Sequence, residues 1–385
     1  QKEKKMTAYQ CLEKNIEKNA EQILSVNKLD IENASANDLS KPLINRLKVS
    51  EESIEGIIKS ISAIKNQPDP IGTVLENWEQ SNGLKFSKIS VPLGVLGVIY
   101  ESRPNVTVDA SCLALKSNNA LILRGGSDSY HTSKQLVNII TKSFVEANLP
   151  ENIIQMIPTT DREAVDHLLE MKDYVNVIIP RGGKSLIKKI NEKSKIPVIK
   201  HLEGLCHVYV DKEADIEIAK NIIFNSKLRR PEICGAAETL LIDSSIKEKA
   251  LELIEPVYKA GCVIRGDDFI TNLDKNFERA NDEDWSTEYL DKIISVKIVD
   301  GVMGATDHIN RYSSNHTESI ITENEESFMN FYNNIDSAII LKNASTQFAD
   351  GGEFGFGAEI GISTDKLHVR GPVGAKHLTT FKYIV

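Results

Sequence analysis

From residue 95 onward the sequence alternates between short apolar runs and longer amphipathic stretches, and this alternation limits the folds open to the chain. Residues 95–100 form an apolar run, which is typical of parallel strands buried on both faces, and residues 175–179 also predict a strand. Stretches with helical periodicity separate such runs, for example residues 130–147. Strands that alternate with helices predict a doubly wound α/β fold with right-handed crossovers. In such sheets, ligands bind outside the carboxyl ends of the strands.

The two ends of the chain differ from this central pattern. Residues 7–80 are rich in Lys, Glu, Asn and Ile at helical spacing, and we expect a solvated helical layer without chemistry. Residues 84–91 alternate like an edge strand, and residues 378–385 also have strand character. An apolar terminal strand is an exposed edge unless another strand pairs with it, so we expect an oligomer.

Composition excludes several classes of function. The 385 residues are 41% hydrophobic and 26% charged, as in ordinary globular proteins of two or three domains. The net charge of −9 argues against nucleic acid or an anionic membrane as the main partner. No apolar stretch is long enough to span a bilayer or to form a signal-peptide core. The five scattered cysteines lack metal-ligand spacing, so we predict a reduced, cytoplasmic protein without a metal site.

Residues 229–241 carry the main functional signal. Cys234 lies among small residues, after Pro231 and before an apolar run that predicts a strand. Small neighbours let a carbonyl group approach the sulfur, and Arg229 and Arg230 offer positive charge that would favour the thiolate. The alternative is a small buried side chain, which is the usual role of an isolated cysteine.

Two Gly-Gly turns follow predicted strands, at Gly125-Gly126 and at Gly182-Gly183. Glycine allows the backbone to approach a ligand, and the helix that follows favours a phosphate at its N-terminus. Neither turn matches a GxGxxG motif or a P-loop, so tight turns without a ligand are an equally good reading of each. A third glycine-rich loop, residues 350–361, must bend sharply or press against a ligand.

Taken together, these segments resemble the aldehyde dehydrogenase superfamily and, within it, the γ-glutamyl phosphate reductase family. The resemblance rests on residues 100–109, 123–127, 179–184, 207–211, 230–234, 237–241, 351–363 and 368–372. It implies an aldehyde dehydrogenase-like α/β fold with a Rossmann-type cofactor domain, an α/β catalytic domain and a small β oligomerisation flap. The implied limits are 1–204 for the cofactor domain (with 84–92 in the flap), 205–358 for the catalytic domain, and 359–385 for a return to the cofactor domain that ends in the oligomerisation strand.

The resemblance also implies a reaction, which is the NADPH-dependent reduction of L-glutamyl γ-phosphate to L-glutamate γ-semialdehyde and phosphate. Cys234 would attack the acyl phosphate and form a thioester. Asn105 and the backbone N–H of Cys234 would stabilise the negative oxygen of the tetrahedral species. Judged from its sequence context alone, Asn105 is better read as a turn or helix-cap residue.

Further site residues follow from the same resemblance. The cofactor-binding residues would be Arg124, Gly125, Gly126, Ser127, Arg181, Gly182, Gly183 and Glu288. The substrate-binding residues would be Arg103, Glu359, His368 and Arg370, with Arg103 or Arg370 available for the α-carboxylate. Ser127 stands where NAD-preferring relatives carry a glutamate, which favours NADP. Glu288 could instead be a solvated loop acid.

Two local departures from the family pattern concern the catalytic region. Lys200 aligns with the general base of oxidising relatives, and residues 200–204 differ from the usual Glu-His-Gly-Asp-Gly. Gly235 replaces the asparagine that usually follows the cysteine. A missing base suits a reductase, because the thioester must be protected from water.

Two rival functions remain open. The first is an NAD(P)-dependent aldehyde dehydrogenase that oxidises a small aldehyde. The second is a non-catalytic nucleotide-binding or scaffold protein. For the reductase we expect a small-molecule substrate, a homodimer or homotetramer, and a separate glutamate kinase as the source of the acyl phosphate, because the chain has no kinase domain.

Overall fold

The computed structural model describes residues 2–39 and 41–385, without the side chains of residues 41 and 42. The chain divides into two compact units. Unit 1 extends to Lys200 and also contains Gly355–Ile362 and Pro372–Val385. Unit 2 contains His201–Phe354 and Ser363–Gly371. The α/β class and the parallel sheets expected from the sequence are confirmed.

Two transitions between the units lie close to the predicted domain limits. The first transition lies at 200/201, where the sequence suggested 204/205. The second lies at 354/355, where the sequence suggested 358/359. Residues 363–371, which we expected to return to the cofactor domain, lie in unit 2.

A four-stranded parallel sheet with the order β5-β4-β3-β6 lies at the centre of unit 1. Its strands are β3 (Val95–Tyr100), β4 (Ala120–Gly125), β5 (Ile154–Met156) and β6 (Val177–Arg181). Tyr100, the last residue of β3, pairs with Gly125 on one side and with Arg181 on the other. Three carboxyl ends therefore lie side by side, and the strand order reverses at β3, as at the ligand-binding edge of doubly wound sheets.

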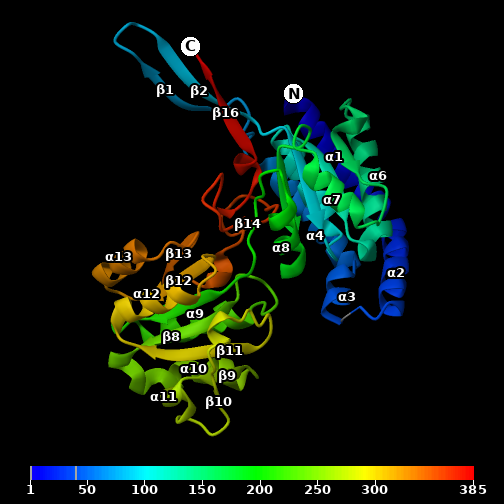
Figure 1. The fold of residues 1–385 in the computed structure, drawn as a ribbon. Helices are drawn as coiled ribbons and strands as arrows, with labels where there is room; N and C mark the ends of the chain where they lie inside the picture. Colours follow the sequence, from blue (N-terminus) through cyan, green and yellow to red (C-terminus); the bar gives the residue numbers. More distant parts are fainter. Residues whose placement is uncertain (1, 40) are drawn as a thin grey trace. The chain divides into compact units, whose positions relative to one another are not determined.

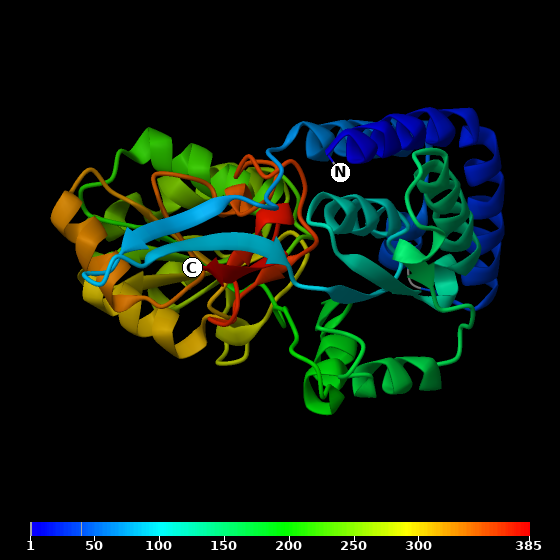
Figure 2. The same cartoon turned by 90° about the horizontal axis from the view of Figure 1, so that it is seen from above.

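Eight helices surround this sheet within the described part of unit 1. They are α1 (Lys2–Lys18), α2 (Ala20–Ala36), α3 (Lys41–Leu47), α4 (Glu51–Asn66), α5 (Asn105–Lys116), α6 (Tyr130–Glu146), α7 (Glu163–Glu170) and α8 (Lys184–Lys193). Helices α1 and α2 pack against α6, and α1 also packs against α4 (Figure 2). The buried Tyr9 hydroxyl donates to the Cys112 carbonyl at 2.8 Å, which joins α1 to α5. The predicted N-terminal helical layer is thus present.

An antiparallel three-stranded sheet, which we call the flap, also belongs to unit 1 (Figure 1). Its order is β1 (Val74–Glu79), β2 (Lys85–Pro92), β16 (Thr379–Ile384). The helical prediction was wrong for β1, because nearly all of its side chains are exposed and its sequence shows no buried face. The prediction of β2 as an edge strand was also wrong, because β2 pairs with β1 on one side and with β16 on the other.

A seven-stranded parallel sheet forms the centre of unit 2, with the order β10-β9-β11-β8-β7-β12-β13. Its strands are β7 (Cys206–Val210), β8 (Ala237–Asp243), β9 (Val263–Gly266), β10 (Glu278–Arg279), β11 (Ile293–Val299), β12 (Thr317–Ile321) and β13 (Ile339–Lys342). The helices are α9 (Ile216–Leu228), α10 (Ala250–Lys259), α11 (Asp268–Thr271), α12 (Gly301–Tyr312) and α13 (Glu325–Asn334). Two short strands, β14 (Ile362–Ser363) and β15 (Gly371–Pro372), lie where the chain passes from one unit to the other.

The amino ends of three neighbouring strands position the candidate site. Strands β8, β7 and β12 are adjacent and parallel, so their first residues lie at one edge of the sheet. Cys206 pairs with Ala237, and His207 pairs with Glu318. The segments that enter these strands therefore meet at the amino edge of the sheet.

Candidate active site

The loop before β8 holds Cys234 in a fixed position. A turn closes around the cysteine, since the Ala236 N–H donates to the Ile233 carbonyl at 3.0 Å. The buried side chain of Gln347 donates to the Arg230 carbonyl at 3.2 Å and so fastens the loop to the body of unit 2. Cys234 is half-buried as a residue. A half-buried cysteine on a fixed loop suits a nucleophile.

Two imidazoles lie beside the sulfur. The sulfur of Cys234 and one ring nitrogen each of His201 and His316 all lie within 4.8 Å of one another. The two rings meet edge to face, with centroids 5.3 Å apart. Nδ1 of the fully buried His316 lies 2.8 Å from the Thr317 hydroxyl, while its Nε2 is buried without a hydrogen-bond partner in the described part of the chain. Within the described residues, Nδ1 of His316 therefore has a hydrogen-bond partner and Nε2 has none.

The charge around Cys234 distinguishes it from the buried cysteines. Burial alone would raise the pKa of the Cys234 thiol, but the positive charges of His316 and then His201 hold this pKa well below its ordinary value. Burial raises the pKa of Cys112, Cys206 and Cys262, in the last case to about 12. The surroundings of Cys234 favour a thiolate over a small core side chain.

The source of the positive charge differs from the sequence expectation. Arg229, which was expected to assist the thiolate, pairs with Glu353 at 2.8 Å. The imidazoles lie far from Cys234 in sequence, and only the pairing of β12 with β7, and of β7 with β8, brings their segments together. Sequence spacing therefore gave no signal for them. One cysteine and two histidines could also hold a thiophilic metal ion, but a metal on the sulfur would remove the nucleophile.

Gly204 links Glu288 to the catalytic loop. A Cβ atom on Gly204 would lie 1.9 Å from the Cys234 carbonyl oxygen, so no larger residue fits without a shift of the backbone. The Gly204 N–H donates to Oε1 of Glu288 at 2.8 Å. Burial raises the pKa of Glu288, while the hydrogen bond from Gly204 lowers it. Glu288 is thus a half-buried acid held next to the loop, which argues against a freely solvated one.

A buried ion pair supports the segment that carries Glu288. Nζ of Lys227 lies 2.6 Å from Oε2 of Glu238, and both side chains are almost fully buried. Oε1 of Glu238 accepts a bond from the Leu290 N–H at 3.3 Å. Burial raises the pKa of Glu238 to about 7, although Lys227 acts in the opposite direction.

The Gly-Gly turns of unit 1 lie at the carboxyl edge of its sheet, as predicted. A Cβ atom on Gly126 would lie 2.2 Å from Oδ1 of Asp128, and one on Gly182 would lie 2.6 Å from Oε2 of Glu101. The Gly183 N–H, at the start of α8, donates to the Glu101 carboxylate at 3.2 Å. This amide already binds an anionic group, and the space beside Gly183 is open. The edge fits a dinucleotide phosphate.

Arg124 makes contacts inside the fold. It is 6% exposed, and its guanidinium donates to the carbonyls of Gly125, Thr160 and Asp161. Its Nε is buried without a hydrogen-bond partner in the described residues. Ser127, by contrast, is exposed at the start of a short 3-10 turn. The cofactor-binding role of Arg124 stays a prediction.

Asn105 is the first residue of α5 in unit 1. The cap position belongs to Pro104, so the Asn105 side chain does not cap this helix. Its Nδ2 donates to Oδ2 of Asp109, one turn later, at 3.3 Å. Asn105 is exposed, which leaves its amide accessible to a ligand.

The four residues predicted to bind substrate are distributed over both units. Arg103 and Glu359 are half-buried in unit 1. His368 is exposed and Arg370 is half-buried in unit 2. Arg370 donates to the carboxylate of Asp336 at 2.9 Å and to the backbone carbonyl of the same residue at 2.7 Å. Their roles toward a substrate stay predictions.

Comparisons with known proteins were made for the whole chain. Within the described residues, no helix has both the length and the apolar character needed to cross a membrane. Residues 5–269 match the model of the aldehyde dehydrogenase family. An engineered glycolyl-CoA reductase with bound NADP+ shares the fold, with a TM-score of 0.73, 17% identity, and coverage of 100% of this chain and 92% of that one.

Three relatives share one name. The gamma-glutamyl phosphate reductase of Bartonella tribocorum is 50% identical over 382 residues, which cover 99% of this chain and 93% of that protein. The protein of that name from Brucella suis is 52% identical over 365 residues, or 94% and 87% of the two chains. The crystal structure of the one from Thermotoga maritima has a TM-score of 0.96 and 39% identity, and covers 100% of this chain and 93% of that one. The chain therefore belongs to the aldehyde dehydrogenase family and, within it, to the gamma-glutamyl phosphate reductases.

Proposed function

We propose that this protein reduces L-glutamyl γ-phosphate to L-glutamate γ-semialdehyde, with NADPH as the reductant and with release of phosphate, the second step of proline biosynthesis from glutamate. One observation carries the proposal. Among the cysteines of a chain that is about 50% identical to gamma-glutamyl phosphate reductases, Cys234 combines partial exposure with a thiol pKa held well below its ordinary value. A cysteine of this kind attacks activated acyl groups.

The chemistry follows from the groups around the sulfur. The Cys234 thiolate attacks the acyl carbon, so that a C–S bond forms, the bond to the phosphate oxygen breaks, and a thioester and phosphate result. The bound nicotinamide supplies a hydride to the thioester carbon. The tetrahedral species then expels the thiolate and releases the aldehyde. His316 and His201 favour the thiolate both as nucleophile and as leaving group, because the same positive charges stabilise it in each step.

NADP is the cofactor that we propose, bound at the carboxyl edge of the unit 1 sheet. Ser127 is exposed and uncharged at this edge, so no carboxylate on residue 127 would repel the 2′-phosphate. The variant Ser127→Glu should weaken NADP+ binding by about tenfold or more and leave NAD+ binding nearly unchanged, since a like charge opposes the phosphate alone. Titration of both nucleotides by calorimetry would measure this. Equal losses for both would argue against NADP selection at Ser127.

The proposed function can be tested by running the reaction in the oxidative direction. L-Glutamate γ-semialdehyde, in equilibrium with pyrroline carboxylate, is mixed with NADP+ and the protein, with and without phosphate. We expect NADPH formation that requires phosphate and that disappears in Cys234→Ala. Oxidation to glutamate without phosphate would instead establish the oxidative aldehyde dehydrogenase. Unchanged cellular function of Cys234→Ala would support a non-catalytic role.

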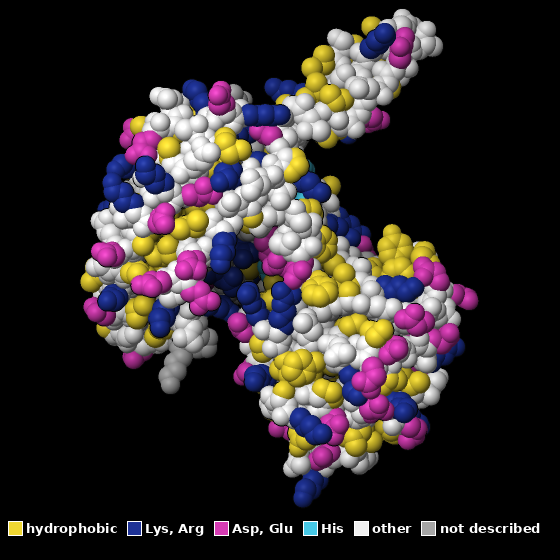
Figure 3. All heavy atoms as spheres, turned by 180° about the vertical axis from the view of Figure 1, so that it is seen from behind, with side chains coloured by type: hydrophobic (Ala, Val, Ile, Leu, Met, Phe, Trp, Pro, Cys, Tyr) yellow, Lys and Arg dark blue, Asp and Glu magenta, His cyan; other side chains and the backbone are white. Residues whose placement is uncertain are grey.

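The flap supports a homo-oligomer, which we propose as the working state. β16 is an edge strand of the flap and exposes Phe381, Tyr383 and Ile384, and the following Val385 is also exposed. Figure 3 shows patches of hydrophobic side chains on the flap, among uncoloured atoms and a few charged side chains. An exposed apolar edge strand pairs readily with a strand of a second copy. Light scattering should show an oligomer for the full chain and a monomer after removal of residues 379–385.

Two further proposals concern the cellular compartment of the protein and the enzyme that makes its substrate. All five cysteines are free, which suits the reducing conditions of the cytoplasm. We also propose that a glutamate kinase makes the acyl phosphate substrate. Pull-down with such a kinase would test whether the two proteins associate.

A further inference from the structure

Three potential metal ligands lie together at the amino edge of the unit 2 sheet. The Cys234 sulfur and one ring nitrogen each of His201 and His316 are all within 4.8 Å of one another. All three residues belong to unit 2, so the cluster is complete within one compact unit. One thiolate and two imidazoles form a donor set that prefers zinc to magnesium or calcium, which bind oxygen ligands.

His316 has one ring nitrogen left for a ligand. Its Nδ1 lies 2.8 Å from the Thr317 hydroxyl and 3.6 Å from the Cys206 sulfur. Its Nε2 is buried and has no hydrogen-bond partner among the described residues. A histidine that binds a metal ion uses one nitrogen for the ion and donates a hydrogen bond from the other. With the proton on Nδ1, donated to the Thr317 hydroxyl oxygen, Nε2 carries the lone pair that a metal ion needs.

The segment that carries His201 allows the cluster to close around an ion. Residues 199–205 form neither helix nor strand, and His201 is half-buried. Zinc binds sulfur at about 2.3 Å and nitrogen at about 2.0 Å, which brings the ligand atoms of a tetrahedral site to about 3.5 Å from one another. The present separations of at most 4.8 Å therefore need only a small contraction. Rotation of the His201 side chain supplies it.

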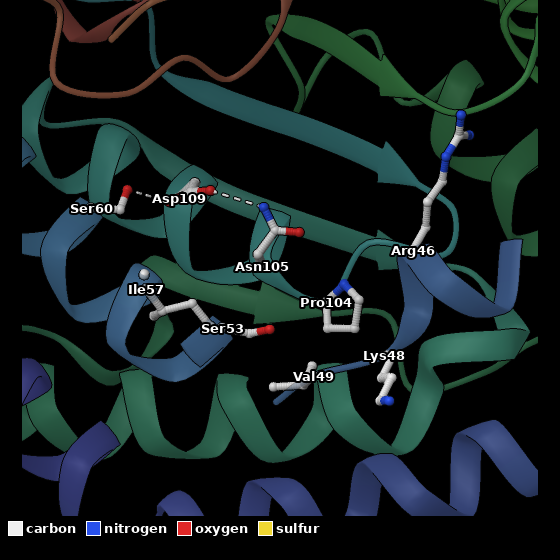
Figure 4. Close-up of a pocket in the computed structure, with 10 residues that line it drawn as sticks. Arg46, Lys48, Val49, Ser53, Ile57, Ser60, Pro104, Asn105 and Asp109 are labelled. Carbon is white, nitrogen blue, oxygen red and sulfur yellow. Dashed lines mark hydrogen bonds between the residues drawn. The ribbon is translucent and has the colours of Figure 1, made fainter. Parts of the chain in front are cut away.

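The charged side chains of a cavity in unit 1 do not converge in this way. This cavity of about 270 Å³ lies between α4, the segment after α3 and the start of α5 (Figure 4). The charged ends of Arg46 and Lys48 point apart and away from Asp109. They therefore indicate no common ligand, whereas the three donor atoms around Cys234 lie close enough to share one ion.

We propose that Cys234, His201 and His316 bind one Zn²⁺ ion, which inhibits the protein reversibly by occupying the sulfur. The sulfur binds as the thiolate and its proton goes to solvent, the two imidazoles bind as neutral ligands, and water fills the fourth position. No electron is transferred, so a chelator reverses the step. Binding of the ion does not depend on the proposed function, but the inhibition rests on it, because it requires Cys234 to be the nucleophile.

Calorimetric titration of the full chain with Zn²⁺ measures the site without catalysis. We expect one ion per chain in the wild type and binding weaker by about 100-fold in Cys234→Ala. His201→Ala and His316→Ala should each bind at least tenfold more weakly, because each removes one of three ligands. His201 is half-buried in an irregular segment, so His201→Ala keeps the test valid if the buried His316 variant does not fold.

Cys206→Ala is the matched control for zinc binding. Cys206 is a buried cysteine next to the cluster but outside it, and this variant should bind Zn²⁺ within about threefold of the wild type. Co²⁺ in place of Zn²⁺ identifies the sulfur directly, since a thiolate bound to cobalt has a charge-transfer band in the near ultraviolet. We expect this band in the wild type and in Cys206→Ala, and its loss in Cys234→Ala.

Alkylation shows whether the ion occupies the sulfur. One equivalent of Zn²⁺ should slow iodoacetamide labelling of Cys234 by at least tenfold and leave labelling of the half-buried Cys11 within twofold. EDTA should restore the original rate. The same loading should remove at least nine-tenths of the phosphate-dependent NADPH formation, and EDTA should restore this activity too.

The outcomes separate this inference from the proposed function. If Zn²⁺ binds and blocks alkylation of Cys234 but the metal-free wild type shows no phosphate-dependent activity, the reaction is wrong and the zinc site stands. If an active wild type binds no Zn²⁺, or if Cys234→Ala binds it as tightly as the wild type, the zinc site is wrong and the reaction stands.

Discussion

The carboxyl edge of the unit 1 sheet and the amino edge of the unit 2 sheet have opposite electrostatic character. At the first edge, α5, α6 and α8 begin after β3, β4 and β6. Helix N-termini carry partial positive charge and free N–H groups, which favour a phosphate. At the second edge, α9 and α12 end before β8 and β12, and helix C-termini carry partial negative charge.

This difference explains why the thiolate needs its own cations. A thiolate at the amino edge gains nothing from the ends of α9 and α12, so side chains must supply positive charge. His316 and His201 do so. The expectation that ligands bind at the carboxyl ends of strands therefore describes the dinucleotide edge of unit 1. It does not describe the position of the proposed nucleophile, Cys234, which lies at the amino edge of the unit 2 sheet.

The largest expected effect comes from the nucleophile at the amino edge. Cys234→Ala should lower the rate by about 10⁴-fold or more, because removal of the nucleophile ends covalent catalysis. Cys206→Ala is the control. Cys206 is buried at the same edge, where it donates to the Cys234 carbonyl at 3.2 Å, and its pKa is raised by burial. We expect this variant to stay within tenfold of wild type in the phosphate-dependent NADP+ assay, and a loss as large as that of Cys234→Ala would break the comparison.

Loss of the buried imidazole should have the next largest effect. His316→Ala removes the first of the positive charges that lower the Cys234 pKa, so this pKa should rise and the thiolate fraction at neutral pH should fall. We expect kcat/KM at pH 7 to fall by roughly 10²–10⁴-fold, the usual range for such groups. Activity should recover in part at higher pH, where the thiol ionises without help.

The matched control is His167→Ala, an exposed histidine of α7 in unit 1. It should keep the wild-type rate and the wild-type pH profile. A His316→Ala enzyme with an unchanged pH profile would mean that the imidazole does not hold the thiolate.

A backbone change at the amino edge should have a smaller effect. Gly204→Ala places a Cβ atom 1.9 Å from the Cys234 carbonyl, so the catalytic loop must move. We expect a loss of about 10²-fold, since a displacement of about 1 Å has costs of this order. Gly304→Ala is the control, because its Cβ atom would lie at an ordinary 3.5 Å from Val299. Equal kcat values for the two variants would show that the loop tolerates displacement.

The smallest effect should come from the carboxyl edge. Gly182→Ala brings a Cβ atom within 2.6 Å of the Glu101 carboxylate, which must shift away from the Gly183 amide. We expect NADP+ affinity to fall about tenfold, or about 1.4 kcal/mol. The alkylation rate of Cys234 should not change, and a parallel loss of both would mean that the two edges do not act separately.

Much of the fold could be predicted from the sequence, because the strands β3 and β6 and the amphipathic helices between them have clear periods. Strand β1 could not be predicted, because its six residues expose almost every side chain and pair only with β2. Cys234 was proposed as the nucleophile from its small neighbours and from the family resemblance, and this role stays a prediction. His316 was missed, because its role depends on the pairing of β12 with β7, which no local pattern encodes. The cavity around Arg46 also comes from tertiary packing alone.

The most direct test of the central claim is the pH dependence of Cys234 alkylation in the wild-type protein. Iodoacetamide labelling at a series of pH values, followed by mass spectrometry of the peptide that contains Cys234, reports the thiolate fraction. The half-buried Cys11 serves as an internal comparison. We predict a half-maximal rate at a pH well below about 8.5, the ordinary thiol value. A half-maximal rate at or above about 8.5 would contradict the account.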